Sequence, residues 1–240
     1  MRRVLITAGA RGIGRAMAEA FDVAGFDVWV TDLDSSALSD LPEDWTGIGA
    51  NVADEGHMRE VFDRIGTVDV VCANAGIAGP TAAVEDVALD DWRACLSVNL
   101  EGAFLAAKYA APLMKKARRG SIILTSSTAG QHGYPYRTPY AAAKWGVIGL
   151  MKTLAMELGP FGVRCNAICP GSVEGPRMEA KDMTRDQVYA GYAAGTSMRS
   201  FVEARDIADM AVFLGSDAAR MVSGQAIAVD GHTENPNPQI

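Results

Sequence analysis

The sequence has 240 residues, of which 49% are hydrophobic and 21% are charged, so it can bury the core of one globular domain. That composition excludes an intrinsically disordered chain, a collagen and a coiled coil. The formal net charge of −7, from 22 basic and 29 acidic residues, argues against a nucleic-acid partner or an anionic membrane partner.

The four cysteines lie in apolar stretches without the paired spacing of a zinc site or a disulfide framework, so we expect buried, reduced thiols. The apolar run near the N-terminus stops at Ala8, which is too early for a secretory leader. No apolar run reaches the roughly 18 residues of a membrane span. These features predict a cytoplasmic protein with no membrane partner and no bound metal.

Short β-branched runs alternate with longer segments whose apolar residues recur near helical spacing. The expected strands are 4–7, 28–31, 68–72, 121–125 and 163–168. The expected helices are 14–24, 55–65, 90–116, 141–158 and 203–215. This alternation predicts an α/β fold, a doubly wound parallel sheet of the Rossmann type with helices on both faces. Because we find no internal repeat and no linker, we expect residues 1–240 to form a single domain.

A glycine-rich segment from Thr7 to Gly14 lies between the first expected strand and the first expected helix. At such a turn a dinucleotide pyrophosphate meets free backbone N–H groups and the positive end of the helix. Asp32 ends the second strand eighteen residues after Gly14, where a carboxylate can accept hydrogen bonds from both hydroxyls of the adenosine ribose. The pattern predicts a dinucleotide site.

The Asp32 carboxylate favours NAD over NADP, because it would repel a 2′-phosphate at close range. Arg11 complicates this choice, since its guanidinium could pair with that phosphate, stay solvated, or pair with Asp32. No basic residue directly follows Asp32, where Leu33, Asp34 and Ser35 stand. We therefore expect NAD as the cofactor, with NADP as the alternative.

Tyr140 and Lys144 follow Pro139 four residues apart, so a helix would place the phenol and the ammonium on one face. A neighbouring cation stabilises the phenolate, which makes tyrosine usable as an acid and base near neutral pH. Ser127 follows an apolar strand, at the sheet edge where open α/β folds bind ligands. Asn99 lies inside an expected amphipathic helix. Asparagine is a poor helix former, so its presence there indicates a role other than helix formation.

Pro170-Gly171 follows the expected strand 163–168. Together with the residues above, it makes the sequence resemble the classical short-chain dehydrogenases/reductases over essentially its whole length. The matching motifs are residues 7–14, Asn74-Ala75-Gly76, Val98-Asn99, Ser127, Tyr140 to Lys144, and Pro170-Gly171. The resemblance implies a catalytic tetrad of Asn99, Ser127, Tyr140 and Lys144. It also implies a sheet of seven strands, and a homotetramer or homodimer assembled through the helices at 90–116 and 141–158. The residues expected at the cofactor are Gly9, Arg11, Gly12, Ile13, Gly14, Asp32, Leu33, Asn51, Val52, Asn74, Ala75, Gly76, Tyr140, Lys144, Pro170, Gly171 and Val173.

Four positions depart from the family's usual pattern. The Thr-Gly start reads Thr7-Ala8, the first asparagine of Asn-Asn-Ala-Gly is Ala73, and the aspartate of an Asp-Val pair is Asn51. A threonine that often follows the Pro-Gly loop is replaced by Gly175. These departures concern contacts to the cofactor, and the tetrad itself is complete.

In the oxidation direction, Tyr140 is expected to take the alcohol proton as general base, while Ser127 hydrogen-bonds the substrate oxygen. The segment at about 172–199 is expected to carry substrate specificity. The side chains expected near the substrate are polar, which favours a small polar secondary alcohol or ketone: a sugar, a polyol or a hydroxy acid. They are Gln131, His132, Tyr134, Arg137 and Arg177.

Two other functions stay open. A 3-oxoacyl-(acyl-carrier-protein) reductase would share the tetrad, but it would use NADPH and dock an acidic carrier through basic patches. Asp32 and the negative net charge argue against it. A non-catalytic dinucleotide-binding regulator would keep the fold without the chemistry, and the complete tetrad argues against that.

Overall fold

The computed structural model describes residues 1–173, 190–191 and 193–234. In this part of the chain, parallel strands form one seven-stranded sheet in the order β3-β2-β1-β4-β5-β6-β7. The strands are β1 (Arg3–Thr7), β2 (Asp27–Asp32), β3 (Thr46–Gly49), β4 (Val70–Ala73), β5 (Gly120–Thr125), β6 (Val163–Pro170) and β7 (Ala226–Val229). The predicted doubly wound parallel sheet is therefore confirmed.

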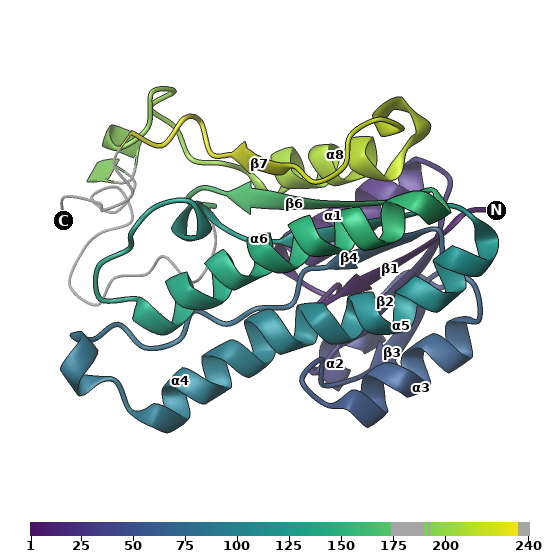
Figure 1. The fold of residues 1–240 in the computed structure, drawn as a ribbon, viewed down its shortest axis with the longest axis horizontal. Coiled ribbons are helices and arrows are strands. Elements are labelled where there is room, and N and C mark those ends of the chain that lie inside the picture. Colours follow the sequence, from purple (N-terminus) through teal and green to yellow (C-terminus); the bar gives the residue numbers. More distant parts are fainter. Residues whose placement is uncertain (174–189, 192, 235–240) are drawn as a thin grey trace.

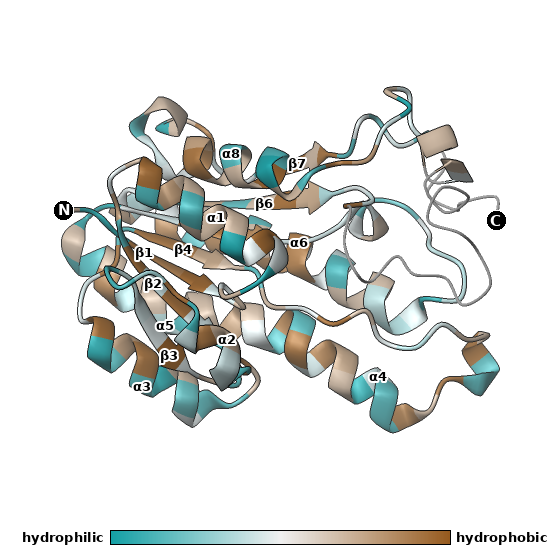
Figure 2. Cartoon of the chain, turned by 180° about the vertical axis from the view of Figure 1, so that it is seen from behind, coloured by the Kyte–Doolittle hydropathy of each residue, from teal (hydrophilic) through white to brown (hydrophobic). Residues whose placement is uncertain are grey.

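Helices cover both faces of the sheet (Figure 1). One face packs against α3 (Glu55–Ile65), α5 (Gly102–Ala117) and α6 (Thr138–Leu158). The other face packs against α1 (Gly12–Val23) and α8 (Ala204–Gly215), with the short helix α2 (Ser35–Ser39) nearby. Alternate residues of each strand enter opposite cores, as Leu5 and its neighbour Ile6 do. Figure 2 shows the resulting concentration of hydrophobic residues on the central strands.

The main differences between the observed and the predicted elements are the following. Strand β3 and helix α2 fall in a stretch where no element was expected, and β4 begins at Val70 instead of residue 68. The expected helix 90–116 is divided into α4 (Leu89–Leu96), a π-helical turn (Ser97–Glu101) and α5. Helix α6 begins at Thr138, so Pro139 lies in its first turn, where proline is favoured.

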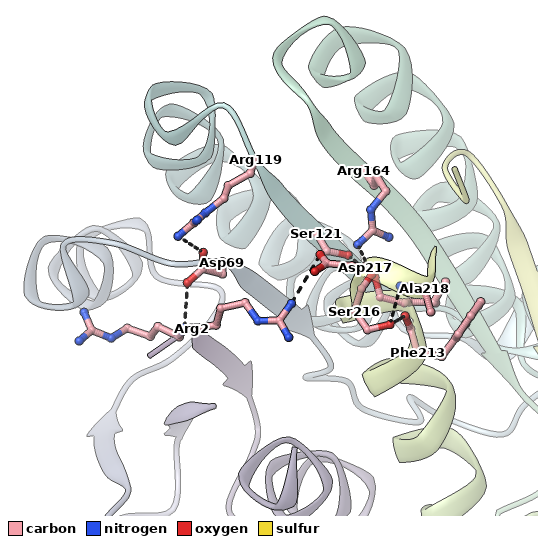
Figure 3. A network of polar contacts seen from close by, with 11 residues as sticks. Arg2, Asp69, Arg119, Ser121, Arg164, Phe213, Ser216, Asp217 and Ala218 are labelled. Atoms are coloured by element: carbon pink, nitrogen blue, oxygen red, sulfur yellow. Dashed lines mark hydrogen bonds and ion pairs between the residues drawn. The ribbon is translucent and has the colours of Figure 1, made fainter. Parts of the chain in front are cut away.

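The two edges of the sheet carry different groups. The carboxyl ends of the strands face the side on which α4 and the first turn of α6 lie (Figure 1). The amino ends face a cavity of about 400 Å³ whose rim includes Arg2, Arg119 and Arg164. There Arg119 pairs with Asp69 at 2.9 Å, and Arg2 pairs with Asp217 at 3.6 Å (Figure 3). This network ties the amino edge together, far from the predicted site.

Candidate functional site

The turn between β1 and α1 packs closely against its surroundings. Gly12 has a φ of +54°, in the left-handed region that favours glycine. A Cβ on Gly14 would collide with the carbonyl oxygen of Ala8 and lie 2.8 Å from the side-chain Nδ2 of Asn74. No side chain caps the start of α1 at Arg11. The first N–H groups of this helix therefore remain available to an anion, as a pyrophosphate site requires.

Asp32 lies at the end of β2, beside this turn. Its carboxylate accepts hydrogen bonds from the backbone N–H groups of Ala10, at 3.2 Å, and Asp34, at 3.1 Å. Arg11 forms an ion pair of 3.0 Å with Asp34, and its side chain remains 68% exposed. The pKa of Asp34 is lowered, mainly by hydrogen bonds from the Ser36 hydroxyl and the Ala37 N–H, with a smaller contribution from Arg11.

Leu33, Asn51 and Val52, three residues expected at the cofactor, lie in two neighbouring loops. Leu33 is 76% exposed directly after β2, and Val52 is buried. The Asn51 side chain accepts a hydrogen bond from the N–H of Ala53 at 3.0 Å, and its backbone N–H donates to His57 Nδ1 at 3.2 Å. The Asn51 amide oxygen is thus held by its own loop.

The loop after β4 is joined to the first turn through Thr7. The Thr7 hydroxyl oxygen accepts hydrogen bonds from the N–H groups of Asn74, at 2.9 Å, and Ala75, at 3.0 Å. The Asn74 side-chain amide donates to the carbonyl oxygen of Thr7 at 3.2 Å. The sequence placed Thr7 in the glycine-rich segment but gave no sign of this role, because the partners are nearly seventy positions away.

Asn99 is buried in the π-helical turn between α4 and α5. Its Nδ2 donates to the carbonyl oxygens of Ile77 and Cys95, both at 2.9 Å. Its Oδ1 is shielded from solvent and has no hydrogen-bond partner among the described residues. A Cβ on Gly76 would lie 2.7 Å from this Oδ1 and 3.3 Å from Lys144 Nζ. The missing side chain at Gly76 therefore lets its backbone lie close to both polar groups.

Lys144 is buried on α6, and its position is fixed from two sides. Its ammonium donates to the carbonyl oxygen of Thr125 at 2.9 Å, and its own carbonyl oxygen accepts from the Ser126 hydroxyl at 2.8 Å. Its Nζ lies 5.5 Å from the centroid of the Tyr140 ring. The spacing of four residues thus brings phenol and ammonium together on one helix face. Thr125 and Ser126 were not among the expected site residues.

Ser127 follows β5 and begins a short 3-10 helix, Thr128–Gly130. Its Oγ accepts a hydrogen bond from the N–H of Ala129 at 3.1 Å, and the residue is half-buried. The thiol of Cys169 on β6 lies close by: burial raises its pKa to about 11, against opposing hydrogen bonds from Ser126 and Ser127. This thiol is protonated at neutral pH and cannot act as a nucleophile there.

The end of β6 places Pro170 and Gly171 at the same sheet edge. The Gly171 N–H donates to the carbonyl oxygen of Val229 at 3.0 Å, and a Cβ on Gly171 would lie 2.8 Å from Asp230 Cα. Val173 pairs with Val202 in an isolated parallel bridge. Most of the segment 172–199, including Arg177 and Gly175, lies outside the described residues.

The loop between Ser127 and Tyr140 carries the other predicted substrate side chains. Gln131, Tyr134 and Arg137 are half-buried, whereas His132 is exposed. Arg137 directly precedes α6, and its Cζ lies 5.8 Å from the centroid of the Tyr140 ring. Arg137 therefore contacts the tetrad through Tyr140.

The described part of the chain also shows the state of the thiols, the metal-ligating side chains and the long helices. All four cysteines are free and buried, as predicted. No group of three or more His, Cys, Asp or Glu residues there could hold a metal ion. None of the helices within the described ranges is long and apolar enough to cross a membrane.

Comparison with known proteins agrees with this geometry. Residues 7–232 match the family model described as enoyl-(acyl carrier protein) reductase. The chain is 38% identical to trans-4-hydroxycyclohexanecarboxylate dehydrogenase of Sinomonas cyclohexanicum, over 95% of this chain and 90% of that protein. It is 35% identical to a 3-oxoacyl-[acyl-carrier-protein] reductase of Thermotoga maritima, over 95% of each chain.

Solved structures give the same result. The crystal structure of levodione reductase superposes with a TM-score of 0.89 and 30% identity, covering 96% of each chain. A 3-oxoacyl-[acyl-carrier protein] reductase from Brucella melitensis gives a TM-score of 0.90 and 35% identity, covering 98% of this chain and 91% of that one. With this sheet and these matches, the chain belongs to the short-chain dehydrogenase/reductase family, whose members use nicotinamide cofactors to oxidise or reduce CH–OH and keto groups.

Proposed function

We propose that this enzyme is an NAD-dependent dehydrogenase that interconverts a small polar secondary alcohol and its ketone. The observation that carries the choice of cofactor is the charge pattern after β2. Asp32 presents a carboxylate toward the β1–α1 turn, while Arg11, the cation beside it, already pairs with Asp34. A 2′-phosphate would meet Asp32 and compete with Asp34 for Arg11, whereas a ribose hydroxyl could donate to Asp32.

The residues at the sheet edge fit a bound dinucleotide. The uncapped start of α1 suits the pyrophosphate. Asn99 Oδ1, a buried acceptor without a partner among the described residues, converges with Lys144 Nζ near Gly76, and this pair suits a polar group that donates and accepts hydrogen bonds. When bound, the nicotinamide supplies the hydride acceptor or donor. The chain's own residues would hold the cofactor and move the proton.

In the proposed mechanism, Tyr140 is the general base during alcohol oxidation and the general acid during ketone reduction. In oxidation the carbinol carbon loses a hydride and the hydroxyl loses a proton to the Tyr140 phenolate, which yields the ketone. Lys144 stabilises the phenolate, since it is a buried cation 5.5 Å from the ring centroid. Ser127 would donate its hydroxyl hydrogen to the substrate oxygen, because its Oγ already accepts from Ala129. Asn99 would hold water that links Lys144 to solvent.

The cofactor choice is tested by comparing kcat/KM for NAD and NADP in the wild-type enzyme and in Asp32→Ser. Two unit charges about 4 Å apart interact by about 4 kcal/mol at a partly exposed site, so wild type should prefer NAD strongly. Asp32→Ser should raise kcat/KM for NADP and lower it for NAD, while Asp40→Ser, at an exposed position on the same side, should change neither. A wild-type preference for NADP would overturn the proposal and favour the acyl-carrier-protein reductase alternative, which two of the relatives represent.

The substrate class is tested with a panel of sugars, polyols, hydroxy acids and simple secondary alcohols. The panel includes trans-4-hydroxycyclohexanecarboxylate, because the relative from Sinomonas cyclohexanicum is named for that substrate. NADH formation at 340 nm is the readout. Oxidation of at least one polar member is expected, and no reaction with any of them would refute the proposed class.

We also propose a homotetramer or homodimer that contacts its copies through α5 and α6. Phe104 on α5 and Trp145 and Met156 on α6 are large apolar side chains that are 46%, 52% and 81% exposed in the single chain. Such exposure on two long helices supports an interface there. Light scattering measures the assembly directly, and a monomeric mass would refute it. A cytoplasmic location remains a prediction from the sequence, with which the four free thiols agree.

A further inference from the structure

Arg137 is positioned at the chemistry edge of the sheet by the loop that ends at α6. Its backbone N–H donates to the carbonyl oxygen of Tyr134 at 3.3 Å, and its carbonyl oxygen accepts from the N–H of Ala141 at 2.9 Å. The guanidinium carbon lies 5.8 Å from the centroid of the Tyr140 ring, and Lys144 Nζ lies 5.5 Å from the same centroid. The Arg137 side chain is therefore next to the proposed general base.

A second loop holds this guanidinium in place. Arg137 Nη1 donates to the Thr81 hydroxyl at 2.5 Å. The backbone N–H of Ala82 donates to the carbonyl oxygen of Tyr136 at 3.0 Å, which joins the loop after β4 to the loop before α6. The side chain is thus fixed in orientation before any ligand binds.

Among the residues that the structure describes, no carboxylate pairs with the positive charge of Arg137. In the described part of the chain no carboxylate lies within 4.0 Å of its guanidinium, and its Nε is shielded from solvent without a hydrogen-bond partner. Eight other arginines do have such a carboxylate: Arg2, Arg3, Arg11, Arg15, Arg93, Arg119, Arg199 and Arg205. The shielded Nε is closed to a ligand, but Nη2 is neither shielded nor hydrogen-bonded among the described residues, so an anion that reaches it would stabilise the guanidinium.

We propose that Arg137 binds a carboxylate of the substrate, so that the enzyme acts on a hydroxy acid and the corresponding keto acid. This deepens the proposed function and rests on it for the reaction itself. The planar fork of a guanidinium matches the two oxygens of a carboxylate. One guanidinium balances one negative charge, which favours a carboxylate over a phosphate dianion. Arg137 is a binding residue in this scheme, and the carboxylate is unchanged by the reaction while the carbinol oxygen meets Tyr140 and Ser127.

The test measures binding without turnover. Cyclohexanecarboxylate and its neutral counterpart cyclohexanecarboxamide are each titrated by calorimetry into the enzyme saturated with NADH; neither probe has a hydroxyl group to oxidise. Wild type should bind the carboxylate about 10- to 100-fold more tightly than the carboxamide, as a charge-assisted pair predicts. Arg137→Gln should lose most of that preference while its carboxamide affinity stays unchanged, which a merely structural role would not produce.

Two further variants complete the experiment. Arg64→Gln removes the same charge from an exposed position on α3 and should behave as wild type. Arg137→Lys keeps the charge without the fork and should retain part of the preference. Equal affinities for the two probes in wild type, no binding of the carboxylate, or an unchanged preference in Arg137→Gln would each overturn the inference. A panel with no oxidised alcohol would instead refute the proposed function, so the two failures are distinguishable.

Discussion

Replacing Gly76 with alanine should damage the site more than the fold. The new Cβ would lie 2.7 Å from Asn99 Oδ1 and 3.3 Å from Lys144 Nζ. Neither neighbour moves easily, because Asn99 Nδ2 is tied to two carbonyl oxygens and the Lys144 ammonium to a third. Overpacking of this kind costs about 1–3 kcal/mol of unfolding free energy. For a domain of this size that lowers Tm by about 2–4 °C per kcal/mol.

The effect on activity should be larger, because the methyl group displaces two groups proposed to serve the reaction. Misplacement of reacting groups by about 1 Å can cost about 100-fold in rate, so we expect a loss of that order in kcat/KM on a panel alcohol. Thermal unfolding followed by circular dichroism, with steady-state kinetics, separates the two effects. Gly159→Ala is the control, since Gly159 has helical φ and ψ, open surroundings and a place at the far end of α6. Full activity and an unchanged Tm in Gly76→Ala would refute the reasoning.

Three further changes test other parts of the site. Tyr140→Phe should lower kcat by about 10²- to 10⁴-fold while NADH affinity, measured by fluorescence, stays unchanged; normal turnover would remove Tyr140 as the acid and base. Ala8 has a left-handed φ of +49°, which costs about 1–2 kcal/mol for a residue other than glycine. Glycine adopts this φ without that cost but has a larger chain entropy in the unfolded state, so Ala8→Gly should raise the free energy of unfolding by up to about 1 kcal/mol. A lower urea midpoint would contradict that expectation. Burial raises the pKa of Cys165 to about 12 and that of Cys169 to about 11, and all four thiols are buried. A thiol reagent at pH 8 should therefore label no cysteine in the native enzyme and four cysteines after unfolding. Rapid labelling of the native enzyme would show that a thiol is accessible.

The central part of the fold was predictable because its strands are short, β-branched and buried on both faces. The sequence pattern did not predict strand β3, because Thr46–Gly49 contains two glycines and one buried apolar residue. Helix α2 was missed because its five residues carry no apolar periodicity, and its start depends on the Asp34 side chain accepting from Ser36 and Ala37. Both are held mainly by neighbouring elements, which sequence periodicity does not report.

The candidate site, like the fold, was predictable from the sequence only in part. Spacing along the chain predicted that Tyr140 and Lys144 would share a helix face, and the structure brings them together. The sequence could not show that Lys144 is held by the Thr125 carbonyl oxygen, or that Thr81 orients Arg137, because those partners are 19 and 56 positions away. A backbone carbonyl carries no sequence signal, and a lone threonine in a loop carries almost none. Local spacing can therefore nominate the reacting groups, whereas the groups that position them come from long-range packing.

Asn99 shows why the two kinds of information must be combined. An asparagine in mid-helix disagrees with local propensity, and the structure resolves the disagreement with a π-helical turn. That turn directs Nδ2 to two carbonyl oxygens and leaves Oδ1 buried without a partner among the described residues. An unsatisfied buried acceptor costs about 1–3 kcal/mol, so a purely structural asparagine would be a poor choice at this position. Since Oδ1 lies beside Gly76 and close to Lys144, this buried acceptor supports the proposal that Asn99 belongs to the reacting site.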